Sequence, residues 1–295
     1  MNTPIQNKID FAIVIGVNHA NPNGDPLNAN RPRQTIDRLG EISDVCLKRK
    51  IRNRLLAMGE EIFVQSDDNR SDDYRSLKAR FDASDVTSSE DVRKAVNEKW
   101  LDVRAFGQVF AFGDAGAGAV SIGIRGPVTI QSAYSLKPIM PESIQITKSV
   151  NLETNEANPD KKDADTMGMK HRVASAIYVA YGAITPQLAT KTGFSDEDAE
   201  KIKLALRSLF EGDASSARPE GSMEVLKVIW CKHNSSCGQY SSAHVHRTIK
   251  IAIDEETGMV DKDKIIKALP ILKPEPELLG PLEGDELAAL PRREK

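Results

Sequence analysis

The sequence is poor in cysteine and contains no long apolar run. Its three cysteines, Cys46, Cys231 and Cys237, match neither a disulfide framework nor a zinc finger in number or spacing. The longest stretch without a charged residue, 173–190, is broken by glycine, proline and glutamine and is too polar to cross a bilayer. The first residues lack the apolar core of a signal peptide. These absences predict a cytoplasmic protein that has no contact with a membrane.

Aromatic side chains and net positive charge are also scarce. Aromatic residues make up 5% of the 295 positions, and 40 basic residues stand against 43 acidic ones, for a net charge of −3. The low aromatic content disfavours a general single-strand RNA-binding protein, which would stack bases on aromatic rings. The charge balance excludes binding to nucleic acid through bulk positive charge, so any such function requires local clustering of basic residues.

What the sequence does contain is a local concentration of basic residues. Residues 30–54 include eight basic and three acidic side chains, whereas residues 66–98 include six basic and nine acidic ones. Charge is therefore segregated along the chain. With 40% hydrophobic residues, the chain is long enough to bury a substantial core without disulfides or metal.

The N-terminal part predicts a buried strand, a loop and a helix. Ile9–Val17 is apolar and β-branched, which is typical of a central strand. Residues 18–33 contain three prolines and many asparagines, which exclude a helix or a ladder strand and predict a long ordered loop. Ser43 is a suitable N-cap for a helix that ends near Met58, and Gly59 terminates it.

The predicted helix has an apolar stripe and a basic flank. The stripe consists of Leu47, Ile51, Leu55 and Met58, at helical spacing. Lys48, Arg49 and Arg52 lie on one side of it. Arg31 and Arg33 lie on the proline-stiffened loop before the helix, where guanidinium groups can grip phosphates at little entropic cost. A basic flank is ordinarily a solvated face, so RNA binding is a hypothesis that depends on further basic residues nearby.

The remaining pattern indicates an α+β protein with a ferredoxin-like sheet and large insertions. Residues 66–97 predict a polar surface excursion with helical turns, and residues from 273 onward a frayed tail. Phe194–Phe210 is an amphipathic helix capped by Ser195. The other predicted strands are 120–132, 144–148, 173–184, 225–230 and 245–253. No linker divides the chain, which predicts one domain.

Three motifs that could carry chemistry have plainer interpretations. Gly113–Gly118 lacks the ending of a P-loop and precedes a strand, so we interpret it as a flexible loop. His244 and His246 alternate on a predicted strand, and two histidines do not make a metal site. Asp25 follows glycine and precedes proline, which suits a turn cap; the alternative is an acid that recruits a cation for strand cleavage. We therefore expect no metal, no cofactor and no catalytic residue.

A second basic group surrounds two methionines in the middle of the chain. Lys148, Lys170, His171 and Arg172 flank the sequence Thr166-Met167-Gly168-Met169. Methionines exposed at a hairpin tip contribute little to a core, but they can wedge between stacked bases. Together with the basic loop and helix, this group favours binding to RNA.

Six short motifs give the chain a resemblance to a known family. They are Asn21–Pro26 with Asn30-x-Pro32-Arg33, Ser43–Arg52, Asp102–Gly107, Arg125–Val128, Thr166–His171 and Thr192–Ser195. In this joint pattern, which covers about residues 9–250, the chain resembles the backbone subunit of type I-C CRISPR surveillance complexes (Cascade). Residues 66–97 and the tail after Lys273 match no part of the family pattern.

The resemblance implies a palm like an RNA-recognition motif (RRM), within a single domain over residues 1–272. It also implies a finger-like insertion at about 66–99, a β-hairpin thumb at about 144–172, and a flexible tail at 273–295. Copies of such a subunit stack head to tail along one CRISPR RNA (crRNA) and form a helical filament. Each thumb flips out one guide nucleotide, and the remaining bases pair with target DNA in antiviral interference.

The residues that the resemblance implies in crRNA binding form three groups. The first group lies on the helix and would hold guide phosphates: Ser43, Lys48, Arg49 and Arg52. The second lies in or beside the thumb: Lys148, Met167, Lys170 and His171. The third lies in the loop and in the other matched motifs: Asn23, Arg31, Arg33, Arg104 and Arg125. Met169 stands where the family would carry a basic residue.

The implied partners are crRNA, target DNA through the guide, other copies of the chain, and the large, guide-processing and small subunits of Cascade. The resemblance implies a structural subunit and not an enzyme. The backbone subunits of type III complexes provide the alternative, a metal-dependent RNase on the same scaffold. In that alternative Asp25 would be the acid that binds the metal.

Overall fold

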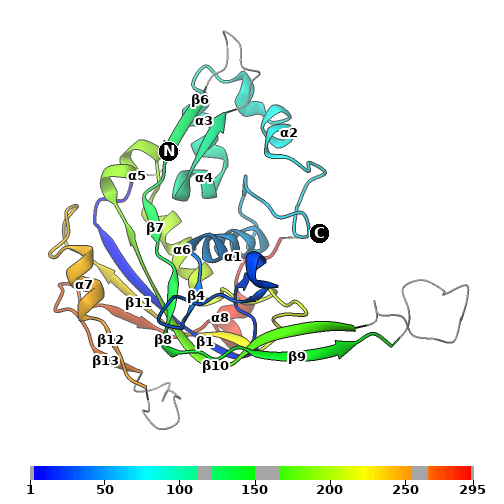
Figure 1. The fold of residues 1–295 in the computed structure, drawn as a ribbon. Helices are drawn as coiled ribbons and strands as arrows, with labels where there is room; N and C mark the ends of the chain where they lie inside the picture. Colours follow the sequence, from blue (N-terminus) through cyan, green and yellow to red (C-terminus); the bar gives the residue numbers. More distant parts are fainter. Residues whose placement is uncertain (1–2, 112–120, 150–166, 254–264, 294–295) are drawn as a thin grey trace, which may run out of the picture.

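The computed structural model describes residues 3–111, 121–149, 167–253 and 265–293. Its centre is an antiparallel sheet in a mixed α/β arrangement, with strands in the order β14-β11-β1-β10-β8-β4 (Figure 1). The bounds of these strands are Glu277–Leu279 (β14), Met223–Lys232 (β11), Ile9–Ala20 (β1), Met167–Ile184 (β10), Ala133–Pro138 (β8) and Leu39–Ile42 (β4). β7 (Val128–Ile130) also pairs with β10. Within the described residues, no helix is both long and apolar enough to cross a membrane.

Strand β1 is central because its side chains are buried on both faces of the sheet. Phe11 and Ile13 point to one face and Ala12 and Val14 to the other, and all four are fully buried. The neighbouring strands β10 and β11 both run antiparallel to it. The predicted central strand is confirmed, and it continues to Ala20.

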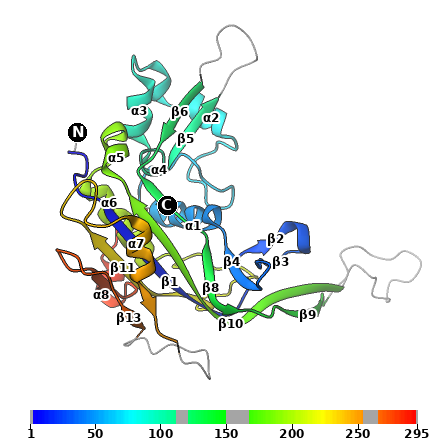
Figure 2. The same cartoon turned by 60° about the vertical axis from the view of Figure 1, so that its left-hand side comes forward.

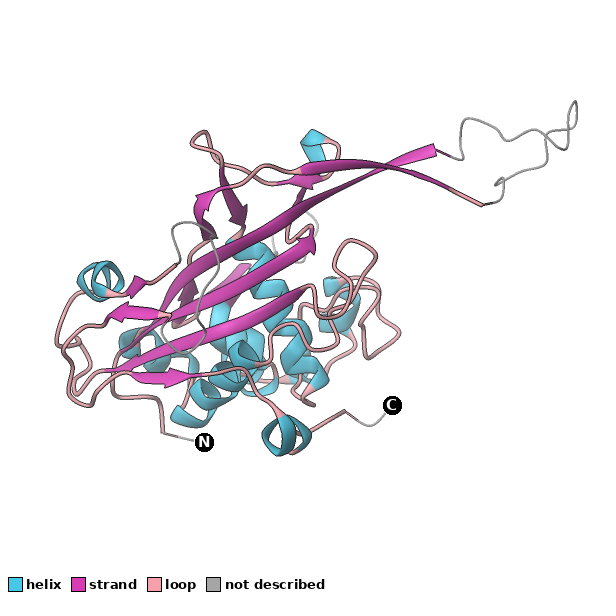
Figure 3. Ribbon diagram, turned by 90° about the horizontal axis from the view of Figure 1, so that it is seen from below, coloured by secondary structure: helices cyan, strands magenta, loops and turns pink. Residues whose placement is uncertain are grey.

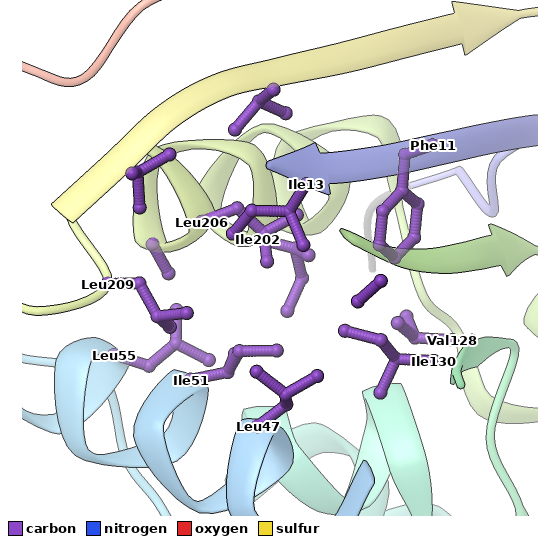
Figure 4. Packing of buried hydrophobic residues seen from close by; sticks show 14 of the residues in the cluster. Phe11, Ile13, Leu47, Ile51, Leu55, Val128, Ile130, Ile202, Leu206 and Leu209 are labelled. Carbon is purple, nitrogen blue, oxygen red and sulfur yellow. The ribbon is translucent and has the colours of Figure 1, made fainter. Parts of the chain in front are cut away.

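Two helices cover one face of the sheet. They are α1 (Asp44–Ala57) and α6 (Asp196–Arg207), and α5 (Pro186–Thr192) leads from β10 into α6. Ser43 begins α1 by accepting a hydrogen bond from Cys46 N at 3.2 Å, and Ser195 forms a capping box with Asp198 on α6. Both predicted helices are confirmed. Figure 4 shows residues of α1, α6 and β1 meeting in the main hydrophobic cluster: Leu47, Ile51, Leu55, Ile202, Leu206, Phe11 and Ile13.

The opposite face of the sheet is covered by a second, thinner layer. It consists of α7 (Ser242–Thr248) and the hairpin of β12 (Lys250–Ile251) and β13 (Ile266–Ala268). Val245 and Ile249 join Ala12 and Val14 in the hydrophobic cluster on this face. Both faces of the central sheet are therefore occupied by the chain itself.

The strand predicted over 245–253 is wrong for most of its length. Its apolar residues Val245 and Ile249 are four positions apart, which places both on one face of a helix. Ser241 caps this helix, α7, through its side chain. The two histidines that the prediction placed on one strand face lie on α7 instead, and only residues 250–251 are a strand.

The segment between α1 and β7 forms an insertion with a hydrophobic cluster of its own (Figures 1 and 2). Its elements are α2 (Leu77–Asp82), the 3-10 turn η2 (Asp85–Ser88), α3 (Val92–Lys99), α4 (Leu101–Phe106), β5 (Gly107–Ala111) and β6 (Ser121–Arg125). Phe63, Trp100 and Phe110 form its centre, with ring centroids 4.6 to 6.4 Å apart. The excursion with helical turns predicted over 66–97 is confirmed, and the insertion extends beyond it. The glycine-rich motif 113–118 lies outside the described residues.

A two-stranded hairpin projects away from the sheet (Figures 1 and 3). It consists of β9 (Glu142–Thr147) and the first residues of β10, in a register that pairs Thr147 with Met167 and Glu142 with Arg172. The two strands of the predicted hairpin are therefore confirmed. The polar loop predicted over 151–165 lies outside the described residues.

The C-terminal segment packs against the body of the protein, contrary to the frayed tail predicted from 273 onward. β14 extends the sheet by pairing with β11, and α8 (Gly284–Ala288) follows it. Leu282 and Leu290 are buried in the main hydrophobic cluster. Four prolines and five glutamates give this segment a disordered composition, but its five leucines are enough to dock it on an open sheet edge.

The loop after β1 contains a small ladder that the sequence did not predict. β2 (Gly24–Asp25) pairs with β3 (Arg31–Pro32), and the turn η1 (Pro26–Asn28) connects them. Backbone hydrogen bonds from Asn30 N to Asp25 O at 2.9 Å and from Arg33 N to Asn23 O at 3.0 Å hold its two ends. The rest of the predicted loop is irregular.

A glycine in β10 marks a position where the core leaves no room for a side chain. A Cβ at Gly182 would lie 2.6 Å from Thr129 O and would collide with the ring of Phe11. We expect Gly182→Ala to lower the free energy of unfolding by about 1–3 kcal/mol, because both neighbours belong to the packed sheet. A Cβ at Gly123 meets no atom within 4 Å, so Gly123→Ala is the control. Equal denaturant midpoints for the two variants would contradict this expectation.

A buried charged cluster joins β1 to the layer on its second face. Asp10 and His233 are fully buried, and His233 Nε2 donates to Asp10 Oδ2 at 2.8 Å while its Nδ1 accepts a backbone N–H. Lys8 Nζ lies 3.1 Å from the same oxygen, and His246 Nε2 lies 3.8 Å from the other. Burial raises the pKa of Asp10, but hydrogen bonds from His233, Ser242 and Lys8 outweigh it and hold that pKa below its ordinary value.

This cluster makes stability depend on pH through His246. Burial lowers the pKa of His246 below its ordinary value of about 6.5, against the attraction of Asp10. The unfolded chain therefore binds the proton more readily, so this contribution is complete above about pH 6.5 and is lost as the pH falls further. His246→Phe keeps the stacking on Tyr181 and should remove this part of the dependence. Denaturant titrations between about pH 7.5 and 5 measure it, and coincident slopes for parent and variant would contradict it.

Candidate nucleic-acid interface

The loop after β1 is fastened to the start of α1 by asparagine side chains. Ser43 N donates to Asn23 Oδ1 at 3.0 Å, and Arg33 N donates to Asn23 O at 3.0 Å. Asn21 Nδ2 donates to Asn30 O at 2.7 Å across the loop. The predicted RNA contact Asn23 therefore holds the loop on the helix, and its side-chain oxygen is already engaged.

This loop presents two of the predicted arginines. Arg31 in β3 is exposed and pairs in the ladder with Asp25. The Arg33 side chain is 35% exposed, its Nη2 lies 3.9 Å from Asp25 Oδ1, and its Nε is buried without a hydrogen-bond partner. Two arginines thus face one loosely paired carboxylate, which leaves this part of the surface positive.

Asp25 caps the turn that follows it. Its Oδ1 accepts a hydrogen bond from Leu27 N at 3.2 Å, and its nearest cation is Arg33. In the part of the chain that the structure describes, no group of three or more His, Cys, Asp or Glu side chains is arranged to hold a metal ion. The contacts of Asp25 are those of a turn cap.

The basic flank of α1 does not act as one surface. Lys48 Nζ lies 3.0 Å from Asp44 Oδ2 in a solvated pair, one turn apart on the helix, which leaves it accessible to another anion. Arg49 Nη1 donates to Val64 O at 2.7 Å, and burial lowers its pKa. Arg49 therefore ties the helix to the start of the insertion, whereas Lys48 faces solvent.

Arg52 and Arg104 are bound to internal acids. Arg52 Nε donates to the fully buried Asp102 at 2.9 Å, and Arg104 makes two hydrogen bonds of 2.8 Å to Asp198. The Arg52 side chain is 13% exposed and that of Arg104 is 15% exposed. Arg52 joins α1 to α4, and Arg104 joins α4 to α6. These guanidinium groups hold the fold together and have little surface left for a phosphate.

Sequence reasoning missed these two acids as partners. Asp102 lies two residues before Arg104 in a motif that the sequence analysis singled out, and Asp198 occupies the third position of the α6 capping box. When a motif or a helix cap fixes the position of an acidic side chain, that acid can be expected to form an ion pair inside the protein. Which arginine it would meet depends on the tertiary fold.

Arg125 stands apart from the other predicted cations. It is exposed at the end of β6, where it pairs in the ladder with Gly107. In Figures 1 and 2, β6 and the hairpin of β9 and β10 lie on opposite sides of α1. The structure therefore does not bring Arg125 together with the loop and the hairpin.

The hairpin carries different side chains on its two faces. Side chains alternate along a strand, so Met167 and Met169 lie on one face of the hairpin and Lys170 on the other. Met167 is 62% exposed and Met169 is 54% exposed, which is a large apolar area for a projecting ribbon. His171 is buried on the methionine face, with Nδ1 2.9 Å from Ser143 Oγ.

The accessible cations come from separate parts of the chain. β3 packs against β10, and the loop that carries β3 is hydrogen-bonded to the start of α1. Figure 2 shows the loop of β2 and β3 beside α1, on the side from which the hairpin projects. We define the basic surface by the cations of these elements that reach solvent: Arg31, Arg33, Lys48, Lys148 and Lys170.

Comparisons with known sequences and structures found proteins that this chain is similar to. A family model described as CRISPR-associated protein Cas7 matches residues 7–268. A protein of Haloferax volcanii named CRISPR-associated protein Cas7 is 28% identical over 214 residues, which are 66% of this chain and 62% of that protein. A chain of a pre-nicking CRISPR RNA-guided surveillance complex has 12% identity and a TM-score of 0.46, over 85% of this chain and 84% of that one. A chain of another CRISPR RNA-guided surveillance complex has 14% identity and a TM-score of 0.45, over 85% and 78%.

Proposed function

Because the chain belongs to the CRISPR-associated Cas7 family, we propose that it is the crRNA-binding backbone subunit of a cytoplasmic type I-C Cascade. In this function the protein grips the guide by its backbone and leaves the bases free to pair with target DNA, so that base pairing reads the sequence. The large, guide-processing and small subunits complete the complex, which acts in antiviral interference. The subunit itself carries out no chemical step.

One observation carries this proposal: a ribbon with exposed methionines projects from the body beside the basic surface. The cations of the basic surface suit the phosphates of a single strand, because each reaches solvent and lies in a strand or helix or directly after one. Met167 and Met169 are unbranched apolar side chains on one face of the ribbon, which suits insertion between bases. A thumb of this kind interrupts the stacking of the guide bases at the point where the thumb crosses the guide.

The topology supports a palm of the RRM type. β11, β1, β10 and β8 lie side by side in that order, α1 follows β1, α6 follows β10, and both helices pack on one face (Figure 1). An RRM ordinarily binds RNA on the other sheet face through aromatic side chains. Here α7 covers that face. We therefore place the guide along the loop, the start of α1 and the hairpin.

The surface chemistry supports assembly of many copies on one guide. A net charge of −3 keeps neighbouring copies from repelling one another as strongly cationic subunits would. Leu27 is 98%, Ile36 102% and Val45 70% exposed, all next to the loop and the start of α1. Apolar side chains in such positions suit a contact with a neighbouring copy. A head-to-tail contact does not close on itself and gives a helical filament whose length the RNA limits.

Purification of the chain from cells that transcribe a CRISPR array tests this function. We expect a large particle that contains short RNA of uniform length, whereas a monomer without RNA would contradict the proposal. Addition of complementary RNA and Mg²⁺ tests the RNase alternative. Cleavage at the spacing of the subunits that disappears in Asp25→Ala would show that the subunit is an enzyme.

A further inference from the structure

A cavity of about 890 Å³ lies beside the second half of α1. Leu56 and Ala57 of α1, Gly212 after α6 and Leu287 of α8 are among the residues that line it. Its lining begins at Lys50, in the middle of the helix, and includes none of the residues that define the basic surface.

The cavity is positively charged in a protein that is negative overall. Five basic and three acidic side chains line it: Lys50, Arg54, Arg70, Arg292, Arg293, Asp68, Glu211 and Asp213. Asp213 contacts Lys50 and lies 3.4 Å from Arg218 Nε, so it is neutralised twice. Arg70 has only a long pair of 3.8 Å with Asp67, which is 81% exposed. The lining therefore has two more positive than negative charges, and because Lys50 is paired with Asp213, this excess lies on the arginines.

Two of these arginines are brought to the cavity by the C-terminal segment. Leu290 is buried in the main cluster, and Arg293 N donates to Ala57 O at 3.1 Å, which fixes the backbone against the end of α1. The side chains of Arg292 and Arg293 are exposed. The docking of the segment thus places two guanidinium groups at the cavity, on a backbone that is already held.

Arginines from α1 and from the C-terminal segment both line the cavity. Arg54 Nε donates to Ser208 Oγ at 2.8 Å and is directed by it. Burial lowers the pKa of Arg54, attraction to Glu211 opposes this, and repulsion from Arg292 adds to it. Glu211 offsets the repulsion at Arg54, and a bound anion would offset the repulsion among the other arginines of the cavity. Guanidinium groups bind phosphate oxygens through two parallel N–H bonds, which makes phosphate the anion that fits best.

We propose that this cavity binds backbone phosphates of a nucleic-acid strand through Arg54, Arg70, Arg292 and Arg293, at a place separate from the basic surface. The inference rests on the proposed function, which supplies two strands: the guide and the DNA paired with it. Several arginines spread over one open cavity suit the repeated phosphates of a strand better than a single small anion. The cavity thus gives each subunit a second hold on nucleic acid.

Salt titrations of the subunit, freed of RNA for one arm and assembled on its guide for the other, test this inference. We compare the parent, Arg292→Ala with Arg293→Ala, and the matched control Arg247→Ala with Lys250→Ala, whose exposed side chains lie on the α7 layer. One arm measures the affinity for labelled guide RNA and the other for labelled complementary DNA. Loss of two phosphate contacts should lower the slope of log affinity against log salt by about 1.4 and the affinity roughly tenfold at about 0.15 M salt. The control should match the parent.

The two arms identify the strand and separate this inference from the proposed function. A change confined to the RNA arm assigns the cavity to the guide, and a change confined to the DNA arm assigns it to the paired strand. Salt slopes of the double variant that match those of the control in both arms would overturn the inference. A parent that binds guide RNA no better than unrelated RNA would refute the proposed function instead, while the difference in salt slope would still report on the cavity.

Discussion

Reversing Arg31, Lys48 and Lys170 to glutamate is expected to abolish stable binding of the guide RNA. The three side chains come from β3, α1 and β10 and belong to the basic surface. Each phosphate that a cation neutralises on a single strand contributes about 0.7 to the slope of log affinity against log salt. Three lost contacts lower the affinity by roughly 50-fold at about 0.15 M salt, and the new carboxylates add repulsion to this loss. Fluorescence anisotropy of a labelled guide at several salt concentrations measures both quantities.

The chain offers a matched control for this experiment. Arg247, Lys250 and Lys267 are also one arginine and two lysines, all exposed, and they lie on the layer of α7, β12 and β13. Their reversal to glutamate changes the net charge by the same amount. We expect it to leave guide binding within a few-fold of the parent, because α7 covers the sheet face on which it lies. A loss of equal size in both triple variants would show that only total charge matters and would remove the basic surface from the interface.

The elements that the sequence predicts correctly are those with strong local signals. β1 is a run of apolar, β-branched residues that needs burial on both faces. The serines that cap α1 and α6 accept hydrogen bonds from backbone N–H groups three residues later in the sequence. Such features need no knowledge of the tertiary fold. The hairpin of β9 and β10 is different, because the resemblance to a known family predicted it and local signals predicted only the strand at 144–148.

The predictions that fail depend on contacts between distant segments. The C-terminal segment has a disordered composition, yet its leucines fit an edge that only the folded sheet provides. Helix α7 has local helix signals, a serine cap and two apolar residues four positions apart, but it is short, and the second face of the sheet buries its apolar side. Local composition cannot reveal the presence of an open edge or an uncovered face elsewhere in the chain.

The same limit applies to the candidate site. Positive charge on the α1 flank is visible in the sequence, but the carboxylate that binds Arg52 is 50 residues away, and that of Arg104 is 94 residues away. An arginine can serve the fold or a ligand, and only its partner in the folded protein decides between them. Of the helix cations, the structure leaves Lys48 to solvent and engages Arg49 and Arg52 inside the protein.

Asp102→Ala is expected to be among the most destabilising single substitutions in the chain. The carboxylate is fully buried and accepts hydrogen bonds from Phe63 N at 2.7 Å, Val64 N at 3.1 Å and Arg52 Nε at 2.9 Å. Its removal leaves two backbone N–H groups and a buried cation without a partner. We expect a loss of about 3–5 kcal/mol in the free energy of unfolding. Asp44→Ala breaks the solvated pair with Lys48 and is the control, with an expected loss below about 1 kcal/mol.

Arg52→Met separates the structural role of the arginine from a role in RNA binding. The methionine can still pack on Phe106, over whose ring the guanidinium lies at 4.9 Å, and Asp102 retains its two backbone donors. We therefore expect a smaller loss of stability than in Asp102→Ala and an unchanged affinity of the folded protein for guide RNA. Denaturant unfolding and anisotropy on the same preparations measure the two effects. If the folded Arg52→Met variant bound guide RNA as weakly as Lys48→Glu does, Arg52 would be a phosphate contact and the carboxylate of Asp102 would serve to orient it.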